Sequence, residues 1–263
     1  ALEITKIHSV AGALPDKEGF IGTRPFRSPH HSISDIALIG GGSIPKPGEI
    51  SLAHYGVLFL DELPEFNRKA LEALRQPLED NLICISRVKR TLTFPCCFIL
   101  AAALNPCPCG NYFNPEKTCH CHTTKIKNYL GKISGPLMDR IDIHIDVPAV
   151  LYRDLTDSKD AEPSKEIKLR VEGARRVQQK RFSAGFCNAQ MHGKLIKEYC
   201  VLDKEAKELL RMAISELGLS ARAYDKILKI SRTIADLSQK EIITAEDVAE
   251  AIQYRSLDRQ LQA

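Results

Sequence analysis

The chain has 263 residues, of which 44% are hydrophobic and 27% are charged, and its formal net charge is +4. This length and composition indicate a globular protein with one large or two ordinary domains. No apolar run approaches the roughly 20 residues of a membrane helix, and no basic and apolar leader opens the chain, so we expect a cytoplasmic protein with no membrane partner. The charge is too small to establish a nucleic-acid partner.

The first 48 residues contain few regular elements. Residues 1–12 predict a short helix that ends at Gly12. The first residues already look like the middle of a helical pattern, so we expect the chain to be a piece of a longer protein. Residues 24–32 form a polar segment, and residues 40–42 are three glycines that predict a flexible loop. No Gly-x-x-x-x-Gly-Lys-Ser/Thr occurs anywhere, so the sequence carries no phosphate loop.

Residues 56–62 run from four consecutive apolar residues straight into two carboxylates. Such a run predicts a strand covered on both faces in a parallel sheet flanked by helices. In open α/β sheets the carboxyl end of a strand faces the ligand crevice. There one acid, Asp61, can hold Mg²⁺ on a nucleotide while Glu62 polarises the attacking water, the pattern of a Walker B segment. A buried strand ending in a solvated turn is the alternative.

The next elements continue an α/β arrangement. Leucines at helical spacing predict a helix over residues 66–80, and residues 82–94 predict a hairpin with a basic tip. A second buried strand is expected over 97–104, followed by Asn105. Strict alternation over 141–147 predicts a third strand near the sheet edge.

Beyond Pro148 the composition shifts to helix formers. A linker over 153–164 and a basic helix over 165–181 precede helices expected near 192–201, 203–217, 221–238 and 245–254, the last opened by a capping pair, Thr244 and Asp247. We therefore expect three parts: a core over 1–150, a linker with the basic helix over 151–191, and a helical bundle over 192–263.

Four of the nine cysteines cluster in sequence: Cys107, Cys109, Cys119 and Cys121. Two close thiolate pairs on one loop suit tetrahedral Zn²⁺, and a reducing cytosol would leave them available. Cys-x-Cys is less specific than Cys-x-x-Cys, and His120 and His122 are alternative ligands. Unliganded reduced thiols, or iron-sulfur or redox chemistry, remain open.

Polar residues follow the predicted strands in an ordered set: Asp61 with Glu62, then Asn105, then Arg140 before the third strand. Asn105 could orient water or sense a γ-phosphate, and Arg140 could stabilise charge on a neighbouring subunit's phosphate. With these residues the sequence resembles the magnesium-chelatase-like branch of the AAA+ ATPases, the bacterial ComM/YifB type. The stretches that carry the resemblance are residues 26–31, 47–62, 105–110, 134–142 and 231–237.

The resemblance implies the C-terminal part of an AAA+ P-loop NTPase core, an α/β fold, followed by an all-α helical lid. It implies ATP and Mg²⁺ as cofactors, with Asp61 binding Mg²⁺, Glu62 as catalytic base and Asn105 as the first sensor. Arg140 matches the arginine finger and Arg222 the second sensor, although Arg222 could also be a surface residue near a helix N-terminus. The chain departs from the family in lacking the Walker A loop.

Two basic features bear on a DNA partner. The hairpin tip, with Arg87, Lys89 and Arg90, lies where related motors carry a DNA-touching hairpin, and we expect it to contact phosphates. For the basic helix over 165–181 we favour a solvated face. His30 and His31 could be a metal or DNA contact, but a polar loop is the preferred interpretation.

The resemblance implies an ATP-driven homo-oligomeric ring, a hexamer, that remodels DNA by branch migration in natural transformation. A chelatase-type remodeller that inserts metal into a protein partner is the second hypothesis. A non-catalytic remnant is the third, since a chain without its phosphate loop is expected to be inactive alone.

Overall fold

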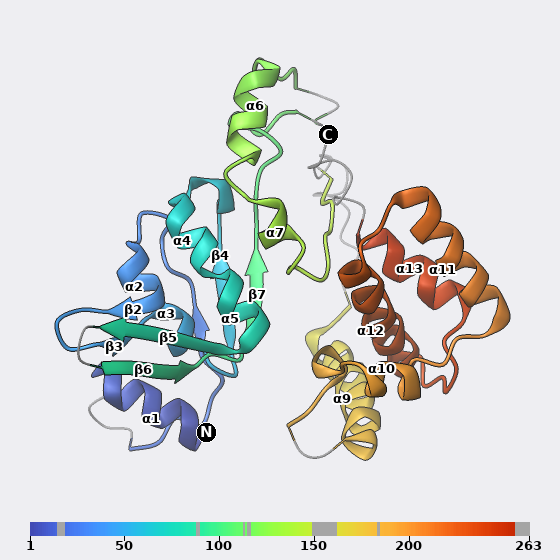
Figure 1. The fold of residues 1–263 in the computed structure, drawn as a ribbon, viewed down its shortest axis with the longest axis horizontal. Helices are drawn as coiled ribbons and strands as arrows, with labels where there is room; N and C mark the ends of the chain where they lie inside the picture. The colour runs from blue at the N-terminus through green and yellow to red at the C-terminus, as the bar shows by residue number, and fades with distance from the viewer. Residues whose placement is uncertain are drawn as a thin grey trace. The chain divides into compact units, whose positions relative to one another are not determined.

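The computed structural model describes residues 1–14, 19–87, 90–112, 114, 117–148, 162–182 and 185–255. The chain divides into two compact units, an N-terminal unit Ala1–Ile141 and a C-terminal unit Asp142–Ala263. The first is an α/β unit and the second is all helical (Figure 1), which confirms the predicted fold class. Along the described parts of the chain, no helix is both long and apolar enough to cross a bilayer.

The N-terminal unit is built on a three-stranded parallel sheet with strand order β1-β4-β7. The strands are β1 (Phe26–Arg27), β4 (Val57–Leu60) and β7 (Ile99–Ala102). β4 and β7 confirm two predicted strands. β1 was not predicted, because a two-residue strand inside a polar segment shows no apolar periodicity.

The two faces of this sheet are covered unequally. Leu58 and Leu60 are fully buried on one face. On the other face Val57 is half-buried, and its paired neighbours Phe26 and Ile99 are 65% and 67% exposed. The expectation that β4 is covered on both faces is therefore correct for one face only.

The helices that precede β5 in this unit are short: α1 (Leu2–Ala11), α2 (Asp35–Ile39), α3 (Glu49–Leu52), α4 (Arg68–Ala73) and α5 (Arg75–Asp80). α1 ends at Gly12 in the left-handed region (φ 73°), as predicted. The single helix predicted over 66–80 is divided between α4 and α5. Pro77 has no N–H to continue the α4 ladder, which accounts for the new start near Leu74.

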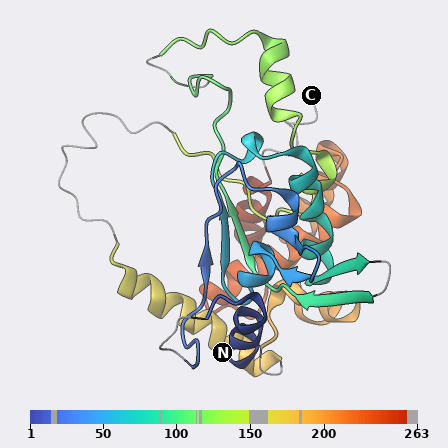
Figure 2. The same ribbon diagram turned by 90° about the vertical axis from the view of Figure 1, so that its left-hand side faces the viewer.

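Two hairpins complete the strands of this unit. The glycine run, expected as a flexible loop, pairs as β2 (Gly40–Gly41) with β3 (Lys46–Pro47). A Cβ on Gly40 would lie 2.5 Å from the Lys46 carbonyl oxygen, so this pairing requires glycine. The predicted basic hairpin is confirmed as β5 (Leu82–Arg87) and β6 (Arg90–Pro95), which projects away from the parallel sheet in Figure 2.

The predicted strand over 141–147 is wrong. After α6 (Thr123–Leu130) and α7 (Gly135–Met138), residues 141–148 form no strand, and Ile143, Ile145 and Val147 are exposed. From Asp142 onward this segment belongs to the C-terminal unit, where the His144 N–H donates to the Tyr254 carbonyl oxygen (2.7 Å). Alternation alone did not make a strand here, because the backbone of this segment is hydrogen-bonded to the end of the last described helix and not to a neighbouring strand.

The C-terminal unit is a helical bundle centred on α12 (Ala221–Leu237). The other helices are α9 (Ser164–Arg181), α10 (Lys194–Tyr199), α11 (Lys204–Leu217) and α13 (Ala245–Gln253). Their core includes Leu210, Ile227 and Val248, all buried. The predicted capping pair is confirmed, since the Thr244 N–H donates to Oδ2 of Asp247 at 2.9 Å.

Candidate nucleotide site and cysteine cluster

The two acids lie at the carboxyl end of β4, where the sequence predicts them. Leu60 is paired with Ala102, the last residue of β7, and the ladder continues through the Leu63 N–H, which donates to the Ala103 carbonyl oxygen at 2.9 Å. Asn105 follows β7 by three residues, so the acids and the amide leave the sheet at the same edge. All three side chains are exposed to solvent and available to a ligand.

Glu62 adopts a backbone conformation that is rare for its residue type. Its φ of 52° and ψ of 48° are left-handed, a region that costs roughly 1–2 kcal/mol for a residue with a Cβ. Its N–H donates to Oδ1 of the preceding Asp61 at 2.9 Å. Such strain is concentrated at functional sites, and here it turns the chain sharply between β4 and the 3-10 turn Leu63–Glu65.

His31 is a contact of Glu62 that sequence reasoning missed. Its Nδ1 lies 3.1 Å from Oε2 of Glu62. The histidine reaches the acid because β1 pairs parallel with β4 and its chain leaves the sheet at the same edge. The sequence offered a signal in the adjacent histidines, but only the unpredicted β1 pairing shows where they go.

A cavity of about 530 Å³ opens beside this histidine. Its charged lining residues are Asp35, Glu65, Arg68 and Lys132, and Nζ of Lys132 lies 3.7 Å from Oε2 of Glu65. The cavity beside His31 is therefore lined by charges of both signs.

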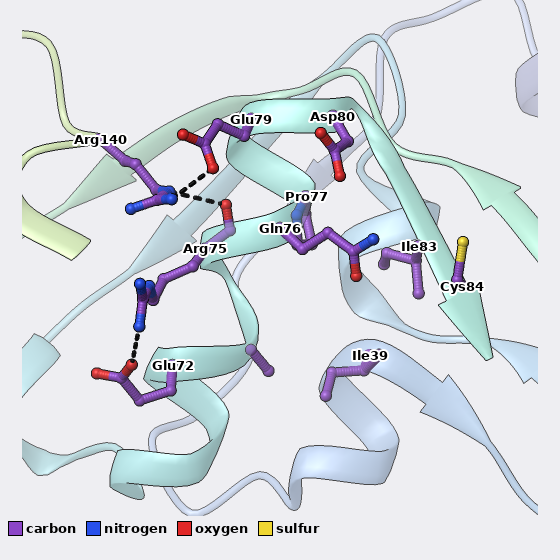
Figure 3. A pocket seen from close by; sticks show the side chains of 11 residues that line it. Ile39, Glu72, Arg75, Gln76, Pro77, Glu79, Asp80, Ile83, Cys84 and Arg140 are labelled. Carbon is purple, nitrogen blue, oxygen red and sulfur yellow. Dashed lines mark hydrogen bonds and ion pairs between the residues drawn. The ribbon is translucent and has the colours of Figure 1, made fainter. Parts of the chain in front are cut away.

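Arg140 is held by its own chain (Figure 3). Its Nε donates to the Arg75 carbonyl oxygen (3.1 Å), its Nη1 to the Pro136 carbonyl oxygen (2.6 Å), and its Nη2 pairs with Glu79. The side chain is only 10% exposed. It lines a second cavity, also of about 530 Å³, against α5. Three of its five N–H groups therefore donate within its own chain.

Arg222 lies in the first turn of α12, as predicted, and its side chain is exposed. Ser220 caps this helix by accepting the Ala223 N–H at 3.2 Å. Arg222 is thus in the C-terminal unit, whereas Asp61, Glu62, Asn105 and Arg140 are all in the N-terminal unit.

The four clustered cysteines come together in space. Their sulfurs all lie within 4.8 Å of one another, and the separations from Cys107 to Cys109, Cys107 to Cys119 and Cys109 to Cys119 are 3.3, 3.7 and 3.6 Å. Tetrahedral Zn–S bonds of about 2.3 Å place sulfurs about 3.8 Å apart, so the set fits zinc. The Asn111 backbone and the Cys107 thiol lower the pKa of Cys109 to about 6. His120 and His122 lie outside this set, in exposed positions.

The basic hairpin tip is only partly described. Arg87 and Arg90 are the last paired residues of the β5–β6 ladder, and Lys89 lies outside the described residues. On α9, by contrast, Lys168 and Arg176 lie 3.8 and 3.9 Å from carboxylate oxygens of Glu172. These two cations of α9 thus have a partner on their own helix.

Comparison with known proteins also gives two successive matches along the chain. The family profile described as "Magnesium chelatase, subunit ChlI" matches residues 1–155, and the profile of the ChlI C-terminal region matches residues 161–255. The chain belongs to the magnesium chelatase ChlI family. This agrees with the resemblance stated from the motifs, and with an AAA+ core followed by a helical lid.

Several curated proteins are similar to this member of the family. Competence protein ComM of Haemophilus influenzae is 49% identical over 91% of this chain, and the protein YifB of Escherichia coli is 45% identical over 90% of it. The Mycobacterium bovis protein Mb2921c is 40% identical over 97% of it. The matches cover 46%, 46% and 51% of these relatives, so the chain spans about half their length.

Proposed function

We propose that this chain is the C-terminal half of an ATP-hydrolysing motor, with Asp61 and Glu62 at its reaction centre. The observation that carries the proposal is the placement of both acids at the carboxyl end of β4, beside the β7 end that leads to Asn105, in a chain of this family. Membership of this family and the carboxylate oxygens at the end of β4 favour ATP with Mg²⁺ as the cofactor.

Each residue of the site has a separate proposed role that follows from its chemistry. Asp61 supplies carboxylate oxygens, the ligands that Mg²⁺ prefers, and Glu62 accepts a proton from the attacking water. The Asn105 amide orients that water or senses the phosphate. Arg140 and Arg222 supply positive charge from a neighbouring subunit and from the lid.

The 263 residues contain no Walker A motif, so we propose that another part of the protein supplies the phosphate loop. The sheet offers a place for more chain: β7 is an edge strand among the described residues, and Ile99 on it is 67% exposed. A further strand paired with β7 would extend the sheet, and an element packed on the exposed face would cover Ile99. This chain alone is therefore proposed to be inactive.

For the whole protein we propose DNA as the partner and branch migration in natural transformation as the task, performed by a hexameric ring in the cytoplasm. The support is the similarity to a protein named for competence and the projecting basic hairpin. The second candidate, remodelling of a protein partner for metal insertion, is favoured by the family profile of a magnesium chelatase subunit.

The full-length protein tests both candidates. ATP hydrolysis is measured with and without DNA, in the parent protein and in Glu62→Gln, with Glu205→Gln on the exposed surface of α11 as the matched control. We expect DNA-stimulated hydrolysis that Glu62→Gln abolishes and Glu205→Gln retains. Hydrolysis indifferent to DNA would favour the protein remodeller, and a full-length gene without a Walker A loop, or one whose product is inactive, would establish a remnant.

We also propose that Cys107, Cys109, Cys119 and Cys121 bind structural Zn²⁺. The convergence of four sulfurs at separations close to those of a zinc-thiolate site supports this. Zinc would fix the loop between Asn105 and α6, whose described residues form neither helix nor strand.

A further inference from the structure

The four-cysteine cluster lies in the chain between two parts of the candidate nucleotide site. Its first ligand, Cys107, follows Asn105 by two residues and is fully buried. Its last ligand, Cys121, precedes α6 by two residues. The described residues from Asn105 to the start of α6 form neither helix nor strand, and Figure 1 shows this loop running from the end of β7 to α6. A constraint on the loop therefore acts on Asn105 at one end and on α6 at the other.

The side chain of Asn105 lies beside the turn that carries the first two ligands, Cys107 and Cys109. The Gly110 N–H donates to the Cys107 carbonyl oxygen at 2.9 Å and closes this turn. Gly110 is left-handed, with a φ of 77°, and a Cβ on it would lie 4.0 Å from Oδ1 of Asn105, an ordinary van der Waals distance. The amide of Asn105 and the backbone of the turn are therefore neighbours, and a shift of the turn changes the surroundings of the amide.

The other end of the loop is anchored near the acids that follow β4. Tyr129 of α6 is only 7% exposed. Burial raises the pKa of Tyr129, and the nearby charges of Glu65 and Glu62 raise it further. Lys132, just after α6, lies with its Nζ 3.7 Å from Oε2 of Glu65. The loop thus begins at Asn105 and ends on a helix that is held close to Glu62 and Glu65.

The backbone of the loop prepares the sulfurs for a metal. The Cys109 sulfur accepts a hydrogen bond from the Asn111 backbone, and the Cys119 sulfur accepts the Cys121 N–H at 3.4 Å. Such bonds favour the thiolate, the form of cysteine that binds metal. Zinc held by four thiolates joins residues near both ends of the loop, and it removes conformational freedom that an irregular loop otherwise keeps.

We propose that the zinc-loaded cluster positions the Asn105 amide for hydrolysis, by fixing the turn beside it and the path of the chain into α6. The proposal rests on the proposed roles of Asn105 and of zinc, and it makes the four cysteines positioning residues that touch no substrate. Loss of the metal releases the turn, so the amide no longer holds the water or the phosphate in place. The rate of hydrolysis then falls, whereas nucleotide binding, which depends on Mg²⁺ and the phosphate loop, remains.

The first test follows the Asn105 side chain in the 263-residue chain, without nucleotide. Nitrogen-edited NMR detects its amide signals, which Asn105→Asp assigns by their loss. We expect these signals to shift and broaden when a chelator removes zinc, and to return when zinc is added. The control is the side-chain amide of Asn81, assigned by Asn81→Asp. This residue lies before β7, at the opposite end of the strand, where its carbonyl oxygen accepts the Cys96 N–H at 2.9 Å.

Three outcomes of this NMR experiment would overturn the proposal. One is a purified chain that takes up no zinc. Another is a set of Asn105 signals that stays unchanged while the zinc leaves. The third is an equal change at Asn105 and Asn81, which would indicate a general loss of structure and no specific link between the cluster and the amide.

The second test measures ATP hydrolysis by the full-length protein. We expect Cys119→Ser to lose zinc and to lower kcat by about 5- to 20-fold, with KM within about 2-fold of the parent. Cys119→His keeps four ligands of the kinds that zinc accepts, so it should restore the metal and bring kcat to within about 3-fold of the parent. Cys84→Ser, at an exposed cysteine of the β5–β6 hairpin, should match the parent. A change confined to KM, or recovery of zinc without recovery of kcat, overturns the proposal.

Gly110→Ala disturbs the turn and leaves all four cysteines in place. A side chain at a φ of 77° strains the backbone, so we expect zinc to stay bound and kcat to fall by about 2- to 5-fold. The matched control is Gly12→Ala at the end of α1, a glycine with a φ of 73° and open space around its Cβ position. Equal kcat in the two variants would overturn the link between the turn and the amide.

A double substitution tests whether the cluster acts through Asn105. Asn105→Ala alone should lower kcat by about 10- to 100-fold. Adding Cys119→Ser should lower kcat by less than about 2-fold more, because the amide that the cluster positions is already absent. If the two effects multiply independently, the positioning role is overturned while hydrolysis stands. If Asn105→Ala or Glu62→Gln keeps full activity, the proposed function of the site fails instead.

Discussion

Arg232 and Asp236 form an ion pair inside the C-terminal unit, with Nε of Arg232 3.1 Å from Oδ1 of Asp236 and the side chains only 1% and 0% exposed. Arg181 brings a second guanidinium to the same carboxylate, at 2.7 and 2.9 Å, and Nδ2 of Asn188 donates to Oδ2 at 2.7 Å. This carboxylate therefore joins α9, the turn at Asn188–Gln190 and α12.

Removing that carboxylate should destabilise the C-terminal unit strongly. In Asp236→Asn two guanidinium groups stay buried without their counter-ion, and breaking a buried pair of this kind costs about 3–5 kcal/mol. Chemical denaturation of the chain measures the change in the free energy of unfolding. The matched control is Glu208→Gln, which breaks the exposed pair of Glu208 with Arg211 (2.6 Å) and should leave that free energy nearly unchanged. Equal destabilisation by the two variants would contradict the buried network.

The stability of the N-terminal unit should depend on pH through His54. This histidine is buried, its Nδ1 accepts the Cys97 N–H at 3.1 Å, and its Nε2 faces Oε2 of Glu3 at 3.3 Å. Burial lowers the pKa of His54, with Glu3 opposing the shift. A lowered folded-state pKa means that stability is complete above the unfolded value of about 6.5 and is lost as the pH falls below it.

We expect the melting temperature to fall by a few degrees between about pH 7.5 and 5.5. His54→Gln, which cannot titrate, should flatten this dependence, and Glu3→Gln, which removes the opposing attraction, should steepen it. Thermal melts at several pH values measure both slopes. A parent protein that melts at the same temperature across this range would contradict the neutral form of His54.

The cysteine cluster predicts a defined metal content. Purified chain should contain about one zinc per molecule, and a chelator should lower its melting temperature. Cys107→Ser and Cys119→Ser should each lose the metal. Cys84→Ser serves as the control, since Cys84 is an exposed cysteine of the β5–β6 hairpin whose sulfur contacts Thr93. A purified protein that contains no metal, and whose melting temperature does not change with chelator, would exclude a structural zinc site.

The proposed role of Arg140 in a neighbouring subunit can be tested by mixing variants of the full-length protein. Arg140→Ala should lower hydrolysis by about 10³-fold, and Glu62→Gln should abolish it. Mixed rings contain interfaces where an intact Glu62 meets an intact Arg140, so activity should return on mixing. Glu79→Gln, which removes the carboxylate partner of Arg140, should retain or raise the rate. Mixtures that stay inactive would restrict Arg140 to the intrachain contacts seen in Figure 3.

Features encoded in local sequence were predictable. The apolar run ending at Asp61, the hairpin at residues 82–94 and the capping pair of α13 are each encoded by a short stretch of chain, and the structure has them. The helix break before Pro77 could have been expected from the proline alone. The alternation over 141–147 was misleading, because a strand also needs a neighbour.

Features that depend on distant partners were not predictable. β1 exists because Phe26 and Arg27 pair with β4, far along the chain, and without β1 nothing in the sequence brings His31 to Glu62. The anchoring of Arg140 on α5 likewise joins residues that are distant in sequence. Sequence patterns indicated which residues are candidates for chemistry, but not which side chains hold them.

The basic hairpin predicts how DNA affinity should depend on charge and salt. Replacing Arg87, Lys89 and Arg90 together by Ala in the full-length protein should weaken DNA binding. It should also reduce the slope of log affinity against log salt by about one for each phosphate that the variant no longer binds. Fluorescence anisotropy at several salt concentrations measures both quantities.

The control for the hairpin removes the same charge from α9. Lys168, Arg170 and Arg176 are exposed and already pair with Glu172 or Glu162, so their replacement by Ala should change affinity less. If both triple variants weaken DNA binding equally, net charge and not the hairpin determines binding. If the hairpin variant binds DNA like the parent, the hairpin does not touch DNA, and the protein remodeller becomes the better-supported function.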